Sequence, residues 1–150
     1  MDLRQYRFVH FATHAFANDV NPDRSGLVLA TDNDSGEDGV LHLSEVYNLK
    51  LDADLVVLSA CETALGRLES GEGMIGLTRG FLYAGSNNVL VSLWKADDVA
   101  TRNLMLDLYQ GIVAGGSFNR SLQAAKLNAI NSSRFNARPY FWAQFVLHGR

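Results

Sequence analysis

The sequence predicts an α/β domain whose mostly parallel β-sheet is flanked by helices. Short apolar runs rich in β-branched and aromatic residues alternate along the chain with longer segments of helical periodicity. Such runs are typical of strands buried on both faces of a parallel sheet, and parallel neighbours need crossover connections that are usually helices. With 150 residues, 47% of them hydrophobic, the chain is long enough for one domain with a sizeable core.

Six segments are predicted as strands from their composition and length. Residues 55–60 (LVVLSA) form the clearest one, because the run is short, largely apolar and followed by a loop. The run over residues 26–30 interrupts a polar and acidic excursion and is predicted as a short surface strand or hairpin arm. The complete set is residues 6–12, 26–30, 40–43, 55–60, 88–94 and 140–147.

Four segments are predicted as helices, and capping signals mark several of their ends. Ser44 is the expected N-cap of a short helix, and Asp97 with Asp98 caps a long helix that ends before Gly115. Gly85 is the expected stop of an amphipathic helix in the middle of the chain. The complete set is residues 45–49, 74–84, 99–113 and 117–130.

The charge and the cysteine content exclude several classes of partner and compartment. A net charge of −3, without a Lys or Arg cluster, favours neither nucleic acid nor an anionic membrane surface as a partner. No window approaches the roughly 18 apolar residues of a membrane span, and the first residues lack the pattern of a secretory signal. Because a single cysteine cannot form an internal disulfide, we expect a reducing, cytoplasmic environment.

A histidine and the chain's single cysteine each follow a predicted strand. His14 comes after residues 6–12, and Cys61 comes directly after residues 55–60. If these strands are parallel neighbours, imidazole and thiol project from the same edge of the sheet, where folds of this class bind ligands. Histidine can take the thiol proton and leave a thiolate that attacks carbonyls. Sharp turns after the strands would direct the backbone N–H groups of Cys61 and Ala15 toward a developing oxyanion.

Other interpretations of these residues stay open at this level. A lone cysteine is often a buried packing residue. His10, on the same strand face as His14, is an alternative base, for which a core role or a supporting role behind the site is favoured. His42 and His148 have no partners at metal spacing, so we expect no metal site. The acidic stretch over residues 32–39 lacks the spacing of a calcium loop and is expected to be solvated.

Five blocks of the sequence carry a family resemblance. They are HFATHA at residues 10–15, SGLVLA at 25–30, VYNLKLDADLVVLSACETALG at 46–66, GEGMIGLTRGFLYAGSNNVLVSLWKADD at 71–98 and PYFWAQFVLHG at 139–149. Together they resemble the CHAT family, whose caspase-like domains are often attached to tetratricopeptide repeats within the clan of caspase-fold cysteine peptidases. The resemblance covers nearly the whole chain and implies one CHAT domain over residues 1–150.

The resemblance implies an activity and a site. The family's base falls on His14 and its nucleophile on Cys61, as the strand positions propose. The implied activity is a cysteine endopeptidase that acts on a protein substrate and needs no cofactor. Attached tetratricopeptide repeats or another regulatory module are expected to control it, and neither nucleic acid nor a membrane is expected as a partner.

Two features depart from the family pattern. The family usually has glycine after the base histidine, where this chain has Ala15, and a need for positive φ there would impair the oxyanion site. A caspase-like fold also has two strands and two helices before the strand that carries the base. The resemblance thus implies that this chain is the C-terminal portion of the domain and lacks the N-terminal strands. The strand over residues 6–12 would then present an unpaired apolar edge, through which the chain could dimerise.

The segment that ends the strand over residues 88–94 supplies candidates for a substrate pocket. Caspase-like enzymes build pockets from this region, so Trp94 is expected to line the cleft and Asp97 or Asp98 to attract a Lys or Arg side chain. Helix capping explains the two acids without any substrate. Two alternatives to a peptidase stay open: an inactive caspase-like interaction or scaffold module, and a small thiol hydrolase or transferase on a flavodoxin-like sheet.

Overall fold

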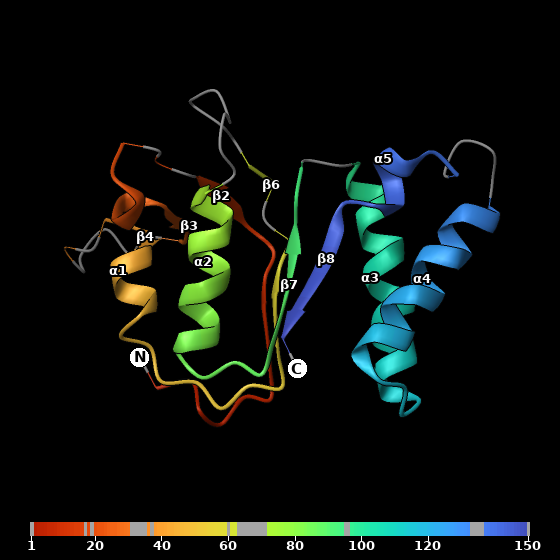
Figure 1. Cartoon of the computed structure of the whole chain (residues 1–150), viewed down its shortest axis with the longest axis horizontal. Coiled ribbons are helices and arrows are strands. Elements are labelled where there is room, and N and C mark those ends of the chain that lie inside the picture. Colours follow the sequence, from red (N-terminus) through yellow and green to blue (C-terminus); the bar gives the residue numbers. More distant parts are fainter. Residues whose placement is uncertain are drawn as a thin grey trace. The chain divides into compact units, whose positions relative to one another are not determined.

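The computed structural model describes most of the chain and divides it into two compact units. The described residues are 2–16, 18, 20–30, 36, 38–59, 61–62, 72–94, 97–132 and 137–149, with only the backbone described at 61, 62, 72 and 73. One unit comprises Met1–Leu93 with Leu147–Arg150, and the other comprises Trp94–Val146 (Figure 1).

A four-stranded sheet forms the centre of the first unit. Three of its strands are parallel neighbours, because the strand that carries Val56 pairs on one side with the strand of Val9 and on the other with the strand of Val89. The fourth strand, whose residues 147–149 belong to this unit, runs in the opposite direction (Figure 1). The strands are, in spatial order, β1 (Phe8–Phe11), β5 (Leu55–Leu58), β7 (Asn88–Ser92) and β8 (Phe145–Gly149). The predicted α/β class with a mostly parallel sheet is therefore confirmed.

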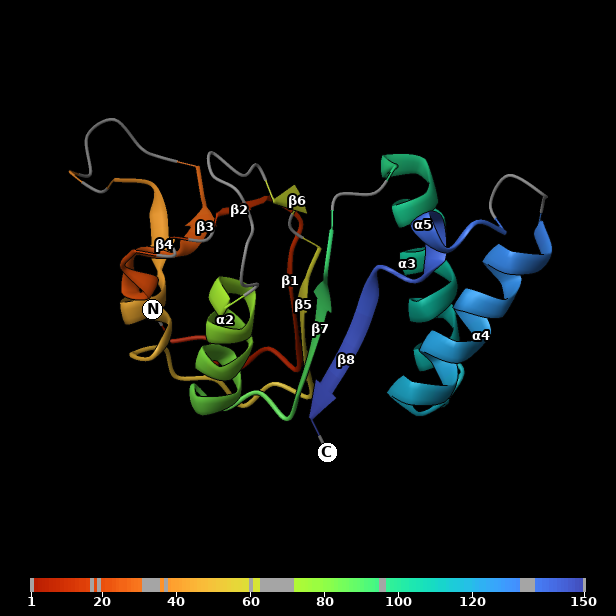
Figure 2. The same ribbon diagram turned by 45° about the horizontal axis from the view of Figure 1, so that its top comes forward.

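A second four-stranded sheet lies beyond the carboxyl ends of β1 and β5 (Figure 2). Its strands are, in spatial order, β4 (Val40–His42), β3 (Gly26–Val28), β2 (His14–Phe16) and β6 (Cys61–Glu62). β3 is antiparallel to both β4 and β2, whereas β2 and β6 are parallel. A 3-10 helix, η1 (Pro22–Arg24), precedes β3. The predicted hairpin arm is confirmed, but its surface position is wrong, because Leu27 of β3 is fully buried.

Two helices of the first unit pack side by side, and the longer one packs against the first sheet (Figure 1). They are α1 (Leu43–Val46) and α2 (Glu72–Tyr83). Gly80 permits their close approach, because a Cβ there would lie 2.9 Å from Leu43 Cδ1. The chain leaves α2 through Gly85, as predicted, with a φ of 113° that favours glycine. A side chain at Gly85 would also clash with the carbonyl oxygen of Leu51.

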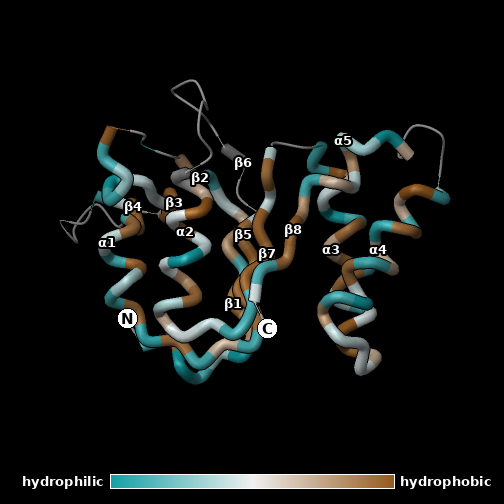
Figure 3. Tube along the Cα trace, in the orientation of Figure 1, coloured by the Kyte–Doolittle hydropathy of each residue, from teal (hydrophilic) through white to brown (hydrophobic). Residues whose placement is uncertain are grey.

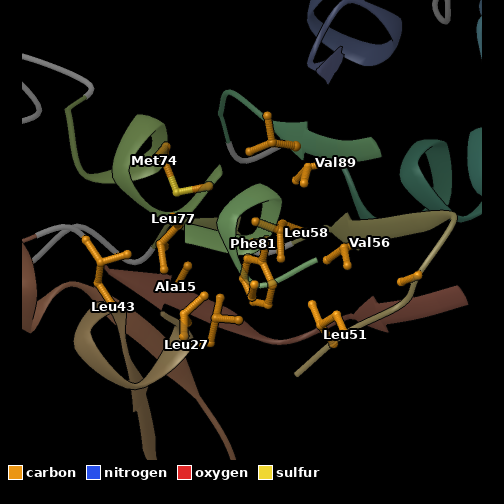
Figure 4. Close-up of a cluster of buried hydrophobic side chains, with 14 residues drawn as sticks. Ala15, Leu27, Leu43, Leu51, Val56, Leu58, Met74, Leu77, Phe81 and Val89 are labelled. Atoms are coloured by element: carbon orange, nitrogen blue, oxygen red, sulfur yellow. The ribbon is translucent and has the colours of Figure 1, made fainter. Parts of the chain in front are cut away.

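The main hydrophobic core lies between α2 and the first sheet (Figure 4). Phe81 is fully buried, and its ring centroid is 5.3 Å from that of Phe11 on β1. Leu77 joins the core from the same helix, and Val56 and Val89 join it from the sheet. All residues of β5 and β7 are buried, and Figure 3 shows their hydrophobic character, whereas β1 alternates between exposed and half-buried residues. The centre of the sheet is therefore β5 and β7, and β1 is its edge.

Helices form the second unit. They are α3 (Asp98–Val113), α4 (Phe118–Ser132) and α5 (Pro139–Trp142). A turn at Gly115, with a φ of 88°, allows α4 to fold back against α3. The segment after α5 is tied to both helices, because Gln144 donates a hydrogen bond to Thr101 Oγ1 over 3.2 Å and Lys126 donates one to the carbonyl of Phe145 over 2.8 Å.

Two details of the predicted elements are wrong. The strand predicted over residues 140–147 begins only at Phe145, because Pro139 starts the helical turn α5 at a position where its missing N–H costs nothing. The N-cap of α1 is His42, not Ser44. The His42 amide donates to Glu45 Oε2 over 2.9 Å, which is the half of a capping box in which the third helical residue reaches back to the N-cap.

Phe81→Ala is expected to lower the free energy of unfolding by about 3–5 kcal/mol, because it leaves a cavity in a fully buried site. Urea unfolding followed by circular dichroism measures the change. Ile75→Ala is the matched control, because Ile75 lies on the same helix with 49% of its surface exposed, and we expect a change within about 0.5 kcal/mol. Equal losses in the two variants would contradict the placement of this core.

Candidate active site

His14 begins β2, which follows β1 after a short break. The strand predicted over residues 6–12 ends at Phe11, but a second strand takes the place of the sharp turn expected after it, because the chain leaves the first sheet after Phe11 and enters the second at His14. Thr13 stabilises the change of sheet by donating a hydrogen bond from its hydroxyl to the carbonyl of Val28. His14 is exposed, whereas Ala15 is fully buried. The end of the predicted strand is thus a transfer from one sheet to the next.

Cys61 begins β6, the short strand that pairs with β2. The structure describes the backbone of Cys61, and its side chain lies outside the described part. The pairing is parallel, with the Cα of His14 opposite that of Cys61 and the Cα of Ala15 opposite that of Glu62. The two segments therefore lie side by side, in the register that the hypothesis of a histidine and cysteine pair requires.

One register joins these segments across both sheets. Phe11 pairs with Leu58 in the first sheet, and His14 pairs with Cys61 in the second. The partners are 47 residues apart in both pairs, so no residue is inserted or omitted between the two sheets. A strand advances about 3.3 Å per residue, and a slip of one residue in either segment would bring a different residue opposite His14.

His10 and Ser59 form a side-chain hydrogen bond beside the break between the sheets. His10 lies on β1 opposite Val57, and its Nε2 is 2.6 Å from Ser59 Oγ. Ser59 also donates its amide proton to the Phe11 carbonyl over 3.1 Å and its hydroxyl to the same oxygen over 3.4 Å. Desolvation by partial burial lowers the pKa of His10 below its usual range, which favours the neutral ring at neutral pH. The alternative base is thus engaged within the sheet by Ser59.

Ala15 lies inside β2 and has a strand neighbour on each side. It pairs with Leu27 of β3 and with Glu62 of β6, so the sharp turn expected after the strand does not occur here. In the described part of the chain, no residue other than glycine has positive φ, and alanine therefore fits this backbone without strain. The assignment of the Ala15 and Cys61 N–H groups to an oxyanion site stays a prediction.

The residues predicted for a substrate pocket belong to the second unit. Asp97 is the N-cap of α3, because its Oδ1 accepts the Ala100 amide over 2.9 Å. Asp98 is exposed in the first turn of the same helix. Trp94 is half-buried, and its Nε1 donates to the Tyr140 carbonyl over 3.0 Å. The capping interpretation is confirmed for Asp97, and the pocket role of all three residues stays a prediction.

Metal ligands and membrane spans were searched among the described residues only. In that part of the chain, no group of three His, Cys, Asp or Glu side chains is placed to hold a metal ion, and no helix combines the length and apolarity of a membrane span. His42 contacts Asp38 at 3.0 Å. The Val40 amide and the His42 side chain lower the pKa of Asp38 by hydrogen bonding to its carboxylate. Residues 32–35 and 37 of the acidic stretch lie outside the described residues.

Reasoning from the sequence missed three polar residues that organise the region around His14. Thr13 and Ser59 hold the transfer between the sheets, and Asn18 shapes the loop after β2 by donating its amide proton to Ser25 Oγ over 2.9 Å and accepting the Asn21 amide over 2.8 Å. The available signal was position, since Thr13 and Ser59 are hydroxyl residues at the ends of apolar strand runs.

The two sheets, with a histidine and a cysteine at paired positions of neighbouring parallel strands, define a caspase-like α/β domain. The chain belongs to the CHAT domain family, whose profile matches residues 1–150. Two curated relatives are tetratricopeptide repeat protein 28 of Mus musculus, 34% identical over 110 residues, and of Homo sapiens, 33% identical over 110 residues. Each match covers 73% of this chain but 4% of the relative, so the chain spans a small part of the length of these proteins.

His10→Gln is expected to flatten the loss of stability on acidification. The folded state holds the pKa of His10 below 6.5, so the unfolded chain binds this proton more readily. The contribution of the neutral His10 ring to the stability of the folded state is complete above about pH 6.5 and declines as the pH falls through the lowered pKa. Urea unfolding should therefore show that the free energy of unfolding of the parent, minus that of the variant, is smaller at pH 5.5 than at pH 7.5. Ile75→Gln is the control, because neither side chain titrates, and its difference in free energy of unfolding from the parent should not change with pH. If the difference for His10→Gln is equally independent of pH, the lowered pKa of His10 does not contribute to stability.

Proposed function

We propose that this CHAT domain is a caspase-like cysteine endopeptidase with Cys61 as nucleophile and His14 as base. The observation that carries the proposal is the parallel register that sets His14 opposite Cys61. Paired residues on neighbouring strands have Cα atoms about 4.8 Å apart, which is close enough for side chains to interact directly. The exposure of His14 supports access of a peptide to the site.

The chemistry follows from the residue types. His14 takes the proton of the Cys61 thiol, and the thiolate attacks the carbonyl carbon of a peptide bond to give a tetrahedral oxyanion. The oxyanion collapses to a thioester as His14 gives the proton to the departing amine. Water, deprotonated by His14, then hydrolyses the thioester and releases the acid and the free thiol. The backbone N–H groups of Ala15 and Cys61 are the candidates for stabilising the oxyanion.

Two further observations support His14 as the base and a repeat segment as the regulator. Nε2 of His10 is occupied by Ser59, whereas His14 stands in register with Cys61. The curated relatives are named as tetratricopeptide repeat proteins, and this supports control of the domain by an attached repeat segment. The pocket role of Trp94, Asp97 and Asp98, the dimer through the edge of β1 and the cytoplasmic location stay predictions of the same proposal.

The pH dependence of thiol alkylation tests the proposal directly. Cys61 is the only cysteine of the chain, so the rate of iodoacetamide incorporation reports on this thiol alone. In the parent we expect half of the maximal rate at a pH of about 7 or lower, because an adjacent imidazolium holds the thiolate. In His14→Ala we expect the midpoint to return to about 8.5, with a roughly tenfold lower rate at pH 7.

His148→Ala is the matched control, because it removes an exposed histidine from β8 and leaves His14 in place. Its alkylation profile should coincide with that of the parent. A parent midpoint of about 8.5 that His14→Ala does not move would refute the dyad. Such a result would favour the non-enzymatic alternative, in which the domain is an interaction module.

A further inference from the structure

We propose that His10 and Ser59 are positioning residues that hold the segment carrying His14 in register with the segment carrying Cys61. The effect of this role on catalysis rests on the proposed peptidase function, whereas its effect on the register of the two segments does not. It assigns a role to a side-chain pair that takes no part in the proposed chemistry and that joins the two segments where they pass from one sheet to the other.

The location of the pair is the first argument. β1 ends at Phe11 and β2 begins at His14, so the strand pairing is interrupted between them. Ser59 bonds to the end of β1 beside this interval, because its amide and its hydroxyl both reach the Phe11 carbonyl and its Oγ also contacts His10 Nε2. Ser59 therefore connects one segment to the other through three contacts, two residues before Cys61.

A neutral imidazole satisfies the short contact between His10 and Ser59 in either direction. With its proton on Nε2 the ring donates to Ser59 Oγ over 2.6 Å and leaves the hydroxyl proton for the Phe11 carbonyl, and with its proton on Nδ1 it accepts the Ser59 hydroxyl proton at Nε2. The pair thus fixes the ring of His10 and the hydroxyl of Ser59 together, as positioning groups around a site usually do.

The position of β1 explains why a side-chain link matters here. β1 is the edge strand of the described first sheet and pairs with β5 alone, and its residues are less buried than those of β5. Apolar burial therefore fixes the register of β1 less strongly than that of the central strands. Misplacement of reacting groups by about 1 Å can cost a hundredfold in rate, so a link that prevents small shifts between the segments has a catalytic effect.

A disulfide trap tests the positioning role without any need for catalysis. In His14→Cys, the introduced thiol stands opposite Cys61 at a Cα separation of about 4.8 Å, within the range that a disulfide spans. Oxidised glutathione supplies the oxidant and is reduced as the two thiols join. We expect rapid cross-linking in His14→Cys and at least threefold slower cross-linking when Ser59→Ala is added, because the segments then shift more freely.

Two matched variants separate positioning from general stability. Ser86→Ala also removes a serine hydroxyl bond in the first unit, from the buried Ser86 Oγ to the Asn88 carbonyl, but far along the chain from the transfer between the sheets. It should lower the urea midpoint about as much as Ser59→Ala and leave the rate of cross-linking unchanged. Ser59→Thr keeps the hydroxyl and should restore the parent rate.

The alkylation profile of Cys61 completes the test in chains that retain His14. Ser59→Ala and His10→Phe should both move the midpoint toward 8.5 and lower the rate at pH 7 by about threefold to tenfold, and Ser59→Thr should not. An activated parent thiol with an unchanged profile in Ser59→Ala would refute positioning and leave the proposed function intact. If Cys61 of the parent has an alkylation midpoint of about 8.5 but Ser59→Ala slows cross-linking in His14→Cys, the peptidase is refuted while the register role stands. Equal cross-linking with and without Ser59→Ala would refute the inference in either case.

Discussion

The parallel pairing of residues 8–11 with residues 55–58, followed by that of residues 14–15 with residues 61–62, is the constraint on which the rest of the first unit depends. It begins in a sheet whose central strand, β5, is buried along its whole length and continues without a change of register into a second sheet. The burial of Val56 and Leu58 against α2 fixes which face of β5 meets the core. Because register sets the face of every later residue, this burial indirectly determines what stands opposite His14.

The second sheet changes the character of the candidate site. Residues at the end of a strand are usually held by loops, but His14 starts a strand that has a neighbour on each side. Leu27 and Ala15 are fully buried in this sheet and join the main core, so the hairpin of β3 and β4 is anchored by apolar packing. Groups placed on paired strands are held more accurately than groups on loops, which is the condition for a nucleophile and base to work together.

The sequence predicted the elements whose signals are local and missed those that depend on contacts across the chain. The apolar run of β5, the glycine stop of α2 and the Asp97 cap of α3 follow from composition and capping chemistry, and all three are confirmed. The second sheet was missed, because a strand that leaves one sheet and joins another looks in sequence like a strand that ends. The helical turn α5 was missed because aromatic β-formers outweighed Pro139 in the prediction. Proximity of the His14 and Cys61 segments could be inferred, whereas the bond between His10 and Ser59 needed coordinates.

The uneven burial of the first sheet has a consequence for how the domain responds to heat. β1 is half-exposed while β5 and β7 are fully buried, and poorly buried edge segments fray at a smaller free-energy cost than the centre of a domain. Because β1 leads directly into β2, fraying of β1 detaches the His14 segment from its partner while α2 stays packed on the remaining strands. Activity of the proposed kind would then disappear during warming before the circular dichroism of the helices changes, and amide hydrogens of β1 would exchange with solvent before those of β5.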